Sequence, residues 1–240
     1  MILYRRPTIE PAGPCPYLPD RECRTQIFLA GELSRAELTE LLRAGWRKFG
    51  HTFFRPRCPG CTQCIPLRIP VADFRPSRSQ RRVLKKNAAT RAAFGPPRYK
   101  DRIYDIYKAH CTRFSDQDTD FDRFIANFFS PSCPGLQSEY YVEDTLAGVG
   151  FLDRGTDCLS SVYFIFDPAY SRLGLGTFSV LREIEETRNR GLEHYYLGYW
   201  VPGCARMEYK ANFFPHELHE RTTGLWQPIS SSVDRKNITS

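Results

Sequence analysis

Three cysteines in one short loop constrain the structure of this chain more than any other feature. Residues 55–70 read RPRCPGCTQCIPLRIP, so that Cys58, Cys61 and Cys64 follow one another at two successive C-x-x-C spacings. Nine cysteines spread over 240 residues would rarely fall so close together by chance. Thiolates at this spacing commonly bind a structural zinc ion or an iron–sulfur cluster, and the loop is therefore a candidate metal site.

Composition and hydropathy pattern indicate a folded cytoplasmic protein. Apolar residues make up 41% of the chain and aromatic residues 14%, which is enough to build a buried core. The sequence has no apolar run of the roughly 18 residues that a membrane span needs. The apolar run in the N-terminal MILYRRPTIEPAG is too short for a signal peptide and lacks a small-residue cleavage site. We therefore expect a cytoplasmic location and no membrane partner.

A fourth cysteine is needed to complete a metal site in the loop. Nine cysteines in a reducing cytoplasm do not normally form a disulfide framework, so the cluster favours metal or redox chemistry. Cys15 is the best fourth candidate, because it lies in GPCPYLPD, a loop that is also rich in Pro and Gly, and Cys23 is the alternative. The predicted ligands of a zinc ion or an iron–sulfur cluster are thus Cys15, Cys58, Cys61 and Cys64. The isolated cysteines are expected to be small buried hydrophobic residues, namely Cys111, Cys133, Cys158 and Cys204.

The positive charge of the chain is concentrated in one segment. Lys and Arg number 34 and Asp and Glu 27, so the net charge is +7. Residues 74–100, FRPSRSQRRVLKKNAATRAAFGPPRYK, carry nine Lys or Arg and no acidic residue, which leaves −2 for the rest of the chain. Such a segment can neutralise nucleic-acid phosphates, although a solvated helix face explains it equally well.

Periodicity and turn residues predict the elements of the first half. Ser34 and Glu37 form a capping box for a helix over 34–44, and a hairpin is expected to turn at Gly50. A strand is expected at IPLRIPVADF, residues 65–74, and a helix should cover 77–90. The Gly/Pro-rich residues after this helix are interpreted as a linker, and two further helices are expected near 100–114 and 119–129.

The second half alternates strands and helices in a recognisable order. Three short segments after residue 138 are rich in β-formers and predict an antiparallel meander. A loop, a helix ending at Gly191, the strand HYYLGYW and a short helix before Pro215 follow. This order is typical of an N-acyltransferase core. We expect an α+β fold, with a cysteine-bearing N-terminal domain (1–95) and an acetyltransferase-like mixed sheet with flanking helices and a flexible tail (96–240).

A glycine turn precedes the helix of the second half. In SRLGLG, residues 171–176, Gly174 and Gly176 leave backbone N–H groups free to receive a phosphate or carboxylate at a helix N-terminus. Acetyltransferases of related fold use a Q/R-x-x-G-x-G/A turn for the pyrophosphate of coenzyme A. Here Ser171 holds the first position and Arg172 is displaced by one, so a tight turn without a ligand remains an alternative.

Several segments together resemble one enzyme family. They are CPYLP (15–19), CPGCTQC (58–64), RIPVADFRPSRSQRRVLKKN (68–87), SVYFIFDP (161–168), SRLGLGT (171–177) and YYLGYWVPGCARMEYKANFFP (195–215). The chain is similar, from roughly residue 10 to 220, to the bacterial aspartate/glutamate leucyltransferases, which are relatives of the arginyl-tRNA-protein transferases. The resemblance implies transfer of leucine or phenylalanine from charged tRNA to proteins that begin with Asp or Glu, which creates an N-degron.

This reaction asks little of the enzyme beyond positioning. The donor is an activated ester at the tRNA 3′ end, and the acceptor is an α-amine that is partly neutral at cellular pH. Orientation can supply effective molarities of about 10⁵ M or more. A proton must still leave the amine, and an oxyanion must be stabilised. The candidate catalytic residues are Asp167 as the base or relay, Tyr163, Tyr199 and Lys210; no cofactor is expected for the chemistry.

Binding roles are predicted for the basic segment and the glycine turn. Arg75 and Arg78 precede the helical part of the segment and are expected to pair with the acidic N-terminal residue of the acceptor. The remaining candidates are expected to contact the tRNA. They are Arg81, Arg82, Lys85, Lys86, Arg172, Gly174, Gly176 and Arg206.

Three other functions remain open from the sequence. The first is an arginyl transferase that acts on the same acceptors. The second is a zinc-ribbon protein that binds nucleic acid without chemistry, although the second half of the chain would then have no role. The third is an acetyltransferase that uses coenzyme A. Stabilisation by acetyl-CoA rather than by leucyl-tRNA would favour the third.

Overall fold

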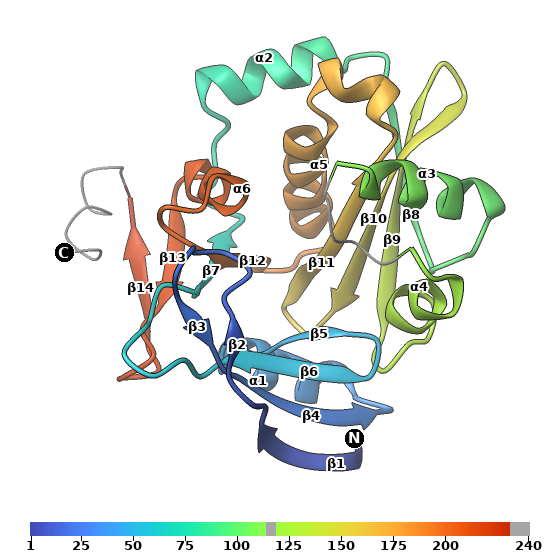
Figure 1. Ribbon diagram of the computed structural model, residues 1–240. Coiled ribbons are helices and arrows are strands. Elements are labelled where there is room, and N and C mark those ends of the chain that lie inside the picture. The colour runs from blue at the N-terminus through green and yellow to red at the C-terminus, as the bar shows by residue number, and fades with distance from the viewer. Residues whose placement is uncertain (114–118, 231–240) are drawn as a thin grey trace.

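The structure, a computed structural model, describes residues 1–113 and 119–230 (Figure 1). The predicted C-terminal tail lies outside the described residues. Two sheets organise the fold, and the smaller one lies at the bottom of the view in Figure 1. A short pair, β2 (Gly13–Pro14) and β3 (Glu22–Cys23), carries the loop of Cys15.

The smaller sheet is built entirely from the first 56 residues. Its strand order is β1-β4-β6-β5, and all its pairs are antiparallel. Helix α1 (Arg35–Arg43) begins at the predicted capping box, in which the Ser34 hydroxyl accepts from the Glu37 N–H. Phe28, Trp46 and Phe53 of this part pack with Leu38 and Leu42 of the helix. The strands are β1 (Ile2–Ile9), β4 (Thr25–Gly31), β5 (Arg47–Phe49) and β6 (Thr52–Pro56).

The larger sheet has eight strands in the order β14-β13-β7-β12-β11-β10-β9-β8. Every pair is antiparallel except β11 with β12. The predicted meander β9-β10-β11 is therefore confirmed. The strands are β7 (Ile65–Pro70), β8 (Arg91–Gly95), β9 (Gly135–Val142), β10 (Thr145–Arg154), β11 (Cys158–Phe166), β12 (His194–Trp200), β13 (His216–His219) and β14 (Trp226–Ile229).

Two strands of the larger sheet come from the N-terminal part of the chain. β7 lies between β12 and β13, and β8 forms the edge next to β9. The interpretation of the residues after the basic helix as a linker is therefore wrong at residues 91–95, where the backbone pairs with β9. The division of the chain at residue 95 stays a prediction.

Helices cover both faces of the larger sheet (Figure 1). Phe124 and Ile106 pack against Val149 and Phe151 on one face, whereas Phe178 packs with Tyr140 on the other. Helix α2 lies across α5 at the top of the view. The helices are α2 (Arg78–Lys86), α3 (Asp101–Cys111), α4 (Phe121–Phe128), α5 (Leu175–Asn189) and α6 (Ala205–Glu208), with 3₁₀ turns η1 (Pro168–Leu173) and η2 (Tyr209–Asn212).

A buried carboxyl group lies where α5 meets the sheet. Glu183 is 1% exposed and accepts hydrogen bonds from Ser138 at 2.8 Å and from Tyr195 at 2.5 Å. Gly150 of β10 makes room for it, because a Cβ there would lie 2.5 Å from the Glu183 carboxylate. Burial raises the pKa of Glu183 to about 7, although the hydrogen bonds oppose this shift.

The described helices give no membrane span. None is both long enough and apolar enough to cross a bilayer. The four isolated cysteines are buried, as predicted.

Candidate active site

The two parallel strands of the larger sheet separate part of the way along. β11 and β12 pair only from Cys158 with His194 to Ser160 with Tyr196. β11 continues to Phe166 and β12 to Trp200. Beyond Ser160 and Tyr196 the two strands no longer hydrogen-bond to each other. Diverging strands leave polar backbone groups that other residues or a ligand must satisfy.

Arg47 of β5 occupies the beginning of this gap. Its Nη1 donates to the Ser160 hydroxyl at 2.7 Å, and its Nη2 donates to the Ser161 carbonyl. A guanidinium from the smaller sheet thus caps β11 at the point where β12 leaves it.

Lys210 of η2 approaches the gap from the side of β12. Its side-chain ammonium donates to the Tyr199 carbonyl at 3.0 Å, and only 9% of the residue is exposed. The cis peptide between Phe214 and Pro215 follows this turn. Lys210 is therefore a buried cation attached to a strand end, which is an unusual place for a lysine without a function.

Gly198 brings the two cations together. A Cβ on this residue would lie 3.2 Å from Lys210 Nζ and 3.7 Å from Arg47 Nη2. Gly198 has a φ of +94° and sits at a register shift between β12 and β7, a conformation that other residues rarely adopt. The bulge therefore creates the space in which Arg47 and Lys210 converge.

No carboxylate in the described part of the chain forms an ion pair with either cation. The nearby Asp153 pairs instead with Lys48 at 3.0 Å, and both of these side chains are less than 10% exposed. The positive charge of Arg47 and Lys210 is thus not cancelled by an acidic residue among residues 1–113 and 119–230. Two such cations side by side favour electron-rich ligands.

Burial and charge set the protonation of Lys210. Burial, and then the charge of Arg47, lower the pKa of Lys210 to about 7. Burial also lowers the pKa of Arg47, but a guanidinium remains charged. At neutral pH the pair therefore combines one permanent cation with one amine that can accept a proton.

The predicted tyrosines lie on the two diverging strands. Tyr199 is 5% exposed, and its hydroxyl donates to the Gly45 carbonyl at 2.9 Å. The Tyr163 ring packs against Phe49 of β5 and against Phe128 of α4. Both residues hold the walls of the gap through packing, and their catalytic role stays a prediction.

Asp167 follows the C-terminal end of β11, where its carboxylate already accepts hydrogen bonds. One carboxylate oxygen accepts from Arg102 at 2.5 Å and the other from the Ala169 N–H at 3.0 Å. Asp167 follows Ser161 by six residues, about 20 Å of extended strand. The structure therefore places it apart from Arg47, and its role as a base also stays a prediction.

The glycine turn forms the entry to α5. Gly174 has a φ of +67°, which favours glycine, and it lies between η1 and the helix. Gly176 sits in the first turn, and a Cβ there would meet no atom within 4 Å. Arg172 is exposed beside them. The turn is open on its outer side, so it is accessible to a ligand.

The basic helix is an exposed face rather than part of the gap. Gln80 is its one buried residue, while the predicted tRNA-binding residues Arg81, Arg82, Lys85 and Lys86 are exposed. Arg78 is exposed at the start of α2. Arg75 precedes it and donates to the carbonyls of Ala72 and Phe74.

Arg206 joins α6 to the first cysteine loop. Its guanidinium donates to the Pro16 carbonyl at 2.9 Å, next to Cys15. The residue is exposed, so it remains accessible to a nucleic acid.

The four predicted metal ligands lie near one another. Burial raises the pKa of the Cys64 thiol, and the charges of Cys15, Cys58 and Cys61 raise it further. Cys58 Sγ also accepts from the Arg24 N–H at 3.4 Å. Their sulfur atoms are not grouped within 4.8 Å of one another in the described residues, so metal binding stays a prediction. By residue type and neighbourhood, the set fits zinc or an iron–sulfur cluster.

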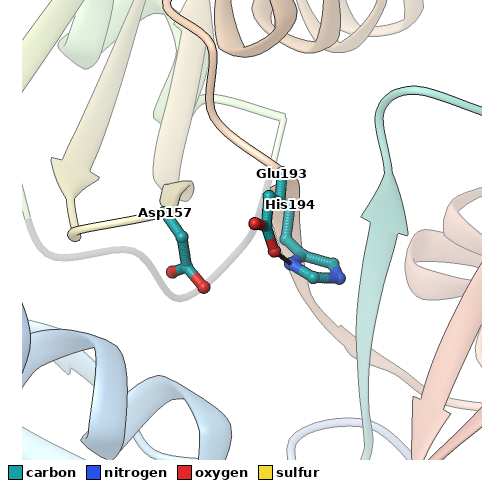
Figure 2. Close-up of side chains that lie close together, drawn as sticks. All are labelled: Asp157, Glu193 and His194. Carbon is teal, nitrogen blue, oxygen red and sulfur yellow. Dashed lines mark ion pairs between the residues drawn. The ribbon is translucent and has the colours of Figure 1, made fainter.

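Two other features of the structure lie away from the strand gap. Asp157, Glu193 and His194 bring ligand atoms within 4.8 Å at the paired end of β11 and β12 (Figure 2). Arg43 already neutralises Asp157, with a separation of 2.6 Å. A groove of about 610 Å³ runs between α2 and α5, but its residues include neither Arg47 nor Lys210.

Arg47 is a candidate functional residue that the sequence did not predict. It lies 113 residues from Ser160 along the chain, so no local pattern connects them. The only signal was the alternation of WRKFG, which would place Arg47 and Lys48 on opposite sides of a strand.

Comparison with known proteins gives the family. The model of the arginine-tRNA-protein transferase C terminus matches residues 99–220, and that of the N terminus matches residues 13–82. An aspartate/glutamate leucyltransferase from Marinobacter nauticus is 34% identical over 227 residues, which cover 92% of this chain and 94% of the relative. One from Thiobacillus denitrificans is 35% identical over 222 residues, with 90% and 92% covered.

A solved structure supports the fold. The C-terminal domain of a lysylphosphatidylglycerol synthetase from Agrobacterium fabrum matches 84% of this chain and 67% of that one, with a TM-score of 0.51 and 12% identity. Together with the mixed sheet and its flanking helices, this likeness confirms the predicted acetyltransferase-like fold. From the two family models and the close relatives, the chain belongs to the arginine-tRNA-protein transferase family and is an aminoacyltransferase.

Proposed function

We propose that this enzyme transfers leucine from leucyl-tRNA to the α-amine of proteins that begin with Asp or Glu, in the cytoplasm, and so creates an N-degron. The names of relatives that cover nine-tenths of the chain support leucine as the donor and Asp or Glu as the acceptor. The convergence of Arg47 and Lys210 at Gly198 carries the assignment of the active site.

The reaction exchanges one bond and moves one proton in two transfers. The acceptor nitrogen attacks the leucyl carbonyl and forms a C–N bond, and the C–O bond to the tRNA 3′ oxygen then breaks. Lys210, whose pKa is about 7, accepts the proton that the amine releases. The same proton passes to the departing 3′ oxygen, so that Lys210 returns to its neutral form. Arg47 stabilises the negative charge on the carbonyl oxygen.

The tRNA is proposed to run from the strand gap over the glycine turn and α2. The N–H groups before and within the first turn of α5 suit the last phosphates or the terminal ribose. The exposed Lys and Arg side chains of α2 suit the phosphates of the acceptor stem, because neutralising the phosphate charge there needs no cavity.

A zinc ion or an iron–sulfur cluster is proposed to be held by Cys15, Cys58, Cys61 and Cys64. When bound, it would cross-link the loop of Cys15 to the loop of Cys58, Cys61 and Cys64, and it would take no part in the transfer itself. The loop of Cys15 is already tied to α6 by Arg206, so the cysteines would help to fix the helix that precedes Lys210.

A transfer assay tests the function directly. The purified protein would be incubated with a mixture of aminoacyl-tRNAs, each radiolabelled in turn, and with peptides that differ only in the first residue. We expect label from leucyl-tRNA on peptides that begin with Asp or Glu, and none on peptides with an acetylated α-amine. Transfer of arginine alone would establish the arginyl alternative, and transfer from acetyl-CoA would replace the proposal with an acetyltransferase.

A further inference from the structure

A small cavity lined by arginines shares Tyr199 with the candidate active site, although neither Arg47 nor Lys210 lines it. It has a volume of about 50 Å³ and is bounded by the end of β6, the cysteine loop and the residues after β13. Three arginines contribute to its wall, and Tyr199, Cys64 and His219 contribute as well. The arginines are Arg55, Arg57 and Arg221.

Uncharged groups hold these arginines in place. Gln26 Oε1 accepts from Arg55 Nε at 2.9 Å and from Arg57 Nε at 3.3 Å, so one amide fixes two guanidinium groups. The Arg55 guanidinium also lies 4.4 Å from the centre of the Trp46 ring. Arg221 donates to the Cys61 carbonyl at 3.2 Å. The cavity is therefore preorganised, because its cations need not be ordered by a ligand.

No Asp or Glu in the described residues forms an ion pair with this cluster. None of the salt bridges found among residues 1–113 and 119–230 includes Arg55, Arg57 or Arg221. Burial lowers the pKa of Arg55, and the charges of Arg57 and Arg221 lower it further. The pKa of His219 is lowered by burial and then by nearby arginines, which keeps the imidazole neutral. Three fixed cations facing one cavity form a site for an anion.

Tyr199 connects the cavity with the proposed catalytic pair. Its side chain lines the cavity, while its carbonyl accepts the hydrogen bond from Lys210 at 3.0 Å. The cavity and Lys210 thus contact the same residue, the cavity through its side chain and Lys210 through its carbonyl. An amino acid whose α-amine lies near Lys210 would have its own side chain within a few bonds of that position.

We propose that Arg55, Arg57 and Arg221 bind the side-chain carboxylate of the N-terminal Asp or Glu of the acceptor protein. This inference rests on the proposed function. A cavity of about 50 Å³ suits a carboxylate, whereas a nucleotide needs several times that volume. A guanidinium also matches a carboxylate in a bidentate geometry, which a lysine cannot reproduce.

The site differs from the one predicted from the sequence. Arg75 donates to two carbonyls of its own segment and precedes α2, whereas the cavity lies at the opposite end of β7. The two assignments therefore make separate predictions for variants, and one set of measurements can distinguish them.

The test compares acidic peptides with their neutral amides. Transfer would be measured on matched peptides that begin with Glu or Gln, with Arg57→Gln and Arg221→Gln as the test variants. Arg75→Gln tests the alternative, and Arg6→Gln, an exposed arginine of β1, is the charge-matched control. Binding of the same peptides in the absence of tRNA would be titrated in parallel, and Arg221→Lys would serve if Arg221→Gln disturbed the cysteine loop.

We expect both test variants to reduce kcat/KM for the Glu peptide by about 10- to 100-fold, as loss of a charged hydrogen bond implies. Transfer to the Gln peptide and the affinity for leucyl-tRNA should stay unchanged, so the Glu/Gln ratio should fall toward one. An unchanged ratio in both test variants, or a loss confined to tRNA affinity, would overturn the inference and identify a phosphate site. If the wild type binds Glu peptides through these arginines but transfers nothing, the proposed function fails and the binding site stands.

Discussion

At the scale of single residues, the protein places ionisable groups where burial changes their behaviour. Lys210 is nearly excluded from water and faces Arg47, so its pKa falls to about 7. Glu183 of α5 is also buried, and its pKa rises to about 7. The same cause, burial of charge, acts in opposite directions on a base and an acid.

The pH dependence of transfer tests the role of Lys210. If its neutral amine accepts the proton, kcat/KM should rise with pH through about 7. Lys210→Met should remove the rise of kcat/KM through pH 7, so that only the ionisation of the peptide amine, with a pKa near 8, remains in the pH profile. Its rate should fall by about 100-fold or more, within the range of a general base. An unaltered profile in Lys210→Met would exclude it as the base.

The stability of the same variant provides an independent readout. The folded pKa of Lys210 lies below its ordinary value of 10.5, so the folded protein binds the proton more weakly than the unfolded chain. The loss of folding stability caused by the buried Lys210 charge is therefore complete below pH 7, and it disappears as the pH rises toward 10.5. In urea unfolding, Lys210→Met should therefore increase the free energy of unfolding, relative to the wild type, more at pH 6 than at pH 10.

Glu183 gives the opposite dependence. Its folded pKa lies above the ordinary value of 4.5, so its contribution to stability falls as the pH rises from 4.5 to about 7 and then stays constant. The shift of about 2.5 units corresponds to roughly 3 kcal/mol. Glu183→Gln should therefore stabilise the protein more at pH 8 than at pH 5 in urea unfolding. Equal effects at both pH values would contradict a buried carboxyl that titrates near neutrality.

At the scale of elements, the structure separates binding surfaces from the catalytic gap. Helix α2 exposes its Lys and Arg side chains to solvent. Its narrow apolar face, which includes Val83 and Leu84, packs on α5. The turn before α5 is open, whereas β11 and β12 are covered on both faces. tRNA contacts are thus expected on helices and turns, and chemistry at the strand ends.

Helix α2 should contribute electrostatically to tRNA binding. Lys85→Ala removes an exposed charge, so it should weaken leucyl-tRNA binding for every sequence and reduce the slope of log affinity against log salt by about one. Filter binding at several salt concentrations would measure both quantities. A slope equal to that of the wild type would mean that Lys85 faces solvent only.

The glycine turn can be tested without disturbing the fold. A Cβ at Gly176 meets open space, and replacing a helical glycine removes an entropic cost of about 1 kcal/mol. We expect Gly176→Leu to unfold at the wild-type denaturant concentration or above it, yet to bind tRNA more weakly because the side chain blocks the turn. Wild-type affinity in a folded Gly176→Leu would remove the turn from the tRNA site.

Local signals in the sequence were enough for many elements. The capping box at Ser34, the turn at Gly50 and the helix before Gly191 are confirmed, because each depends on neighbouring residues. β8 was missed because only its distant partner β9 makes it a strand. Arg47 was missed for the same physical reason, since its role depends on contacts made more than a hundred residues away.

At the scale of the whole molecule, the N-terminal part completes the catalytic sheet. β7 enters between β12 and β13, and β5 delivers Arg47 to the gap beside β11. The cysteine loop directly precedes β7 and lines the arginine cavity. A change at Cys64 can therefore reach the arginine cavity directly.

We infer that the aminoacyl ester binds where β11 and β12 separate. This inference is tested most directly by an experimental structure with a stable amide analogue of the leucylated 3′ adenosine of tRNA. We expect the leucyl carbonyl to lie beside Gly198, within hydrogen-bond distance of Arg47 and Lys210. An analogue seated elsewhere, with Lys210 still bonded only to the Tyr199 carbonyl, would contradict it.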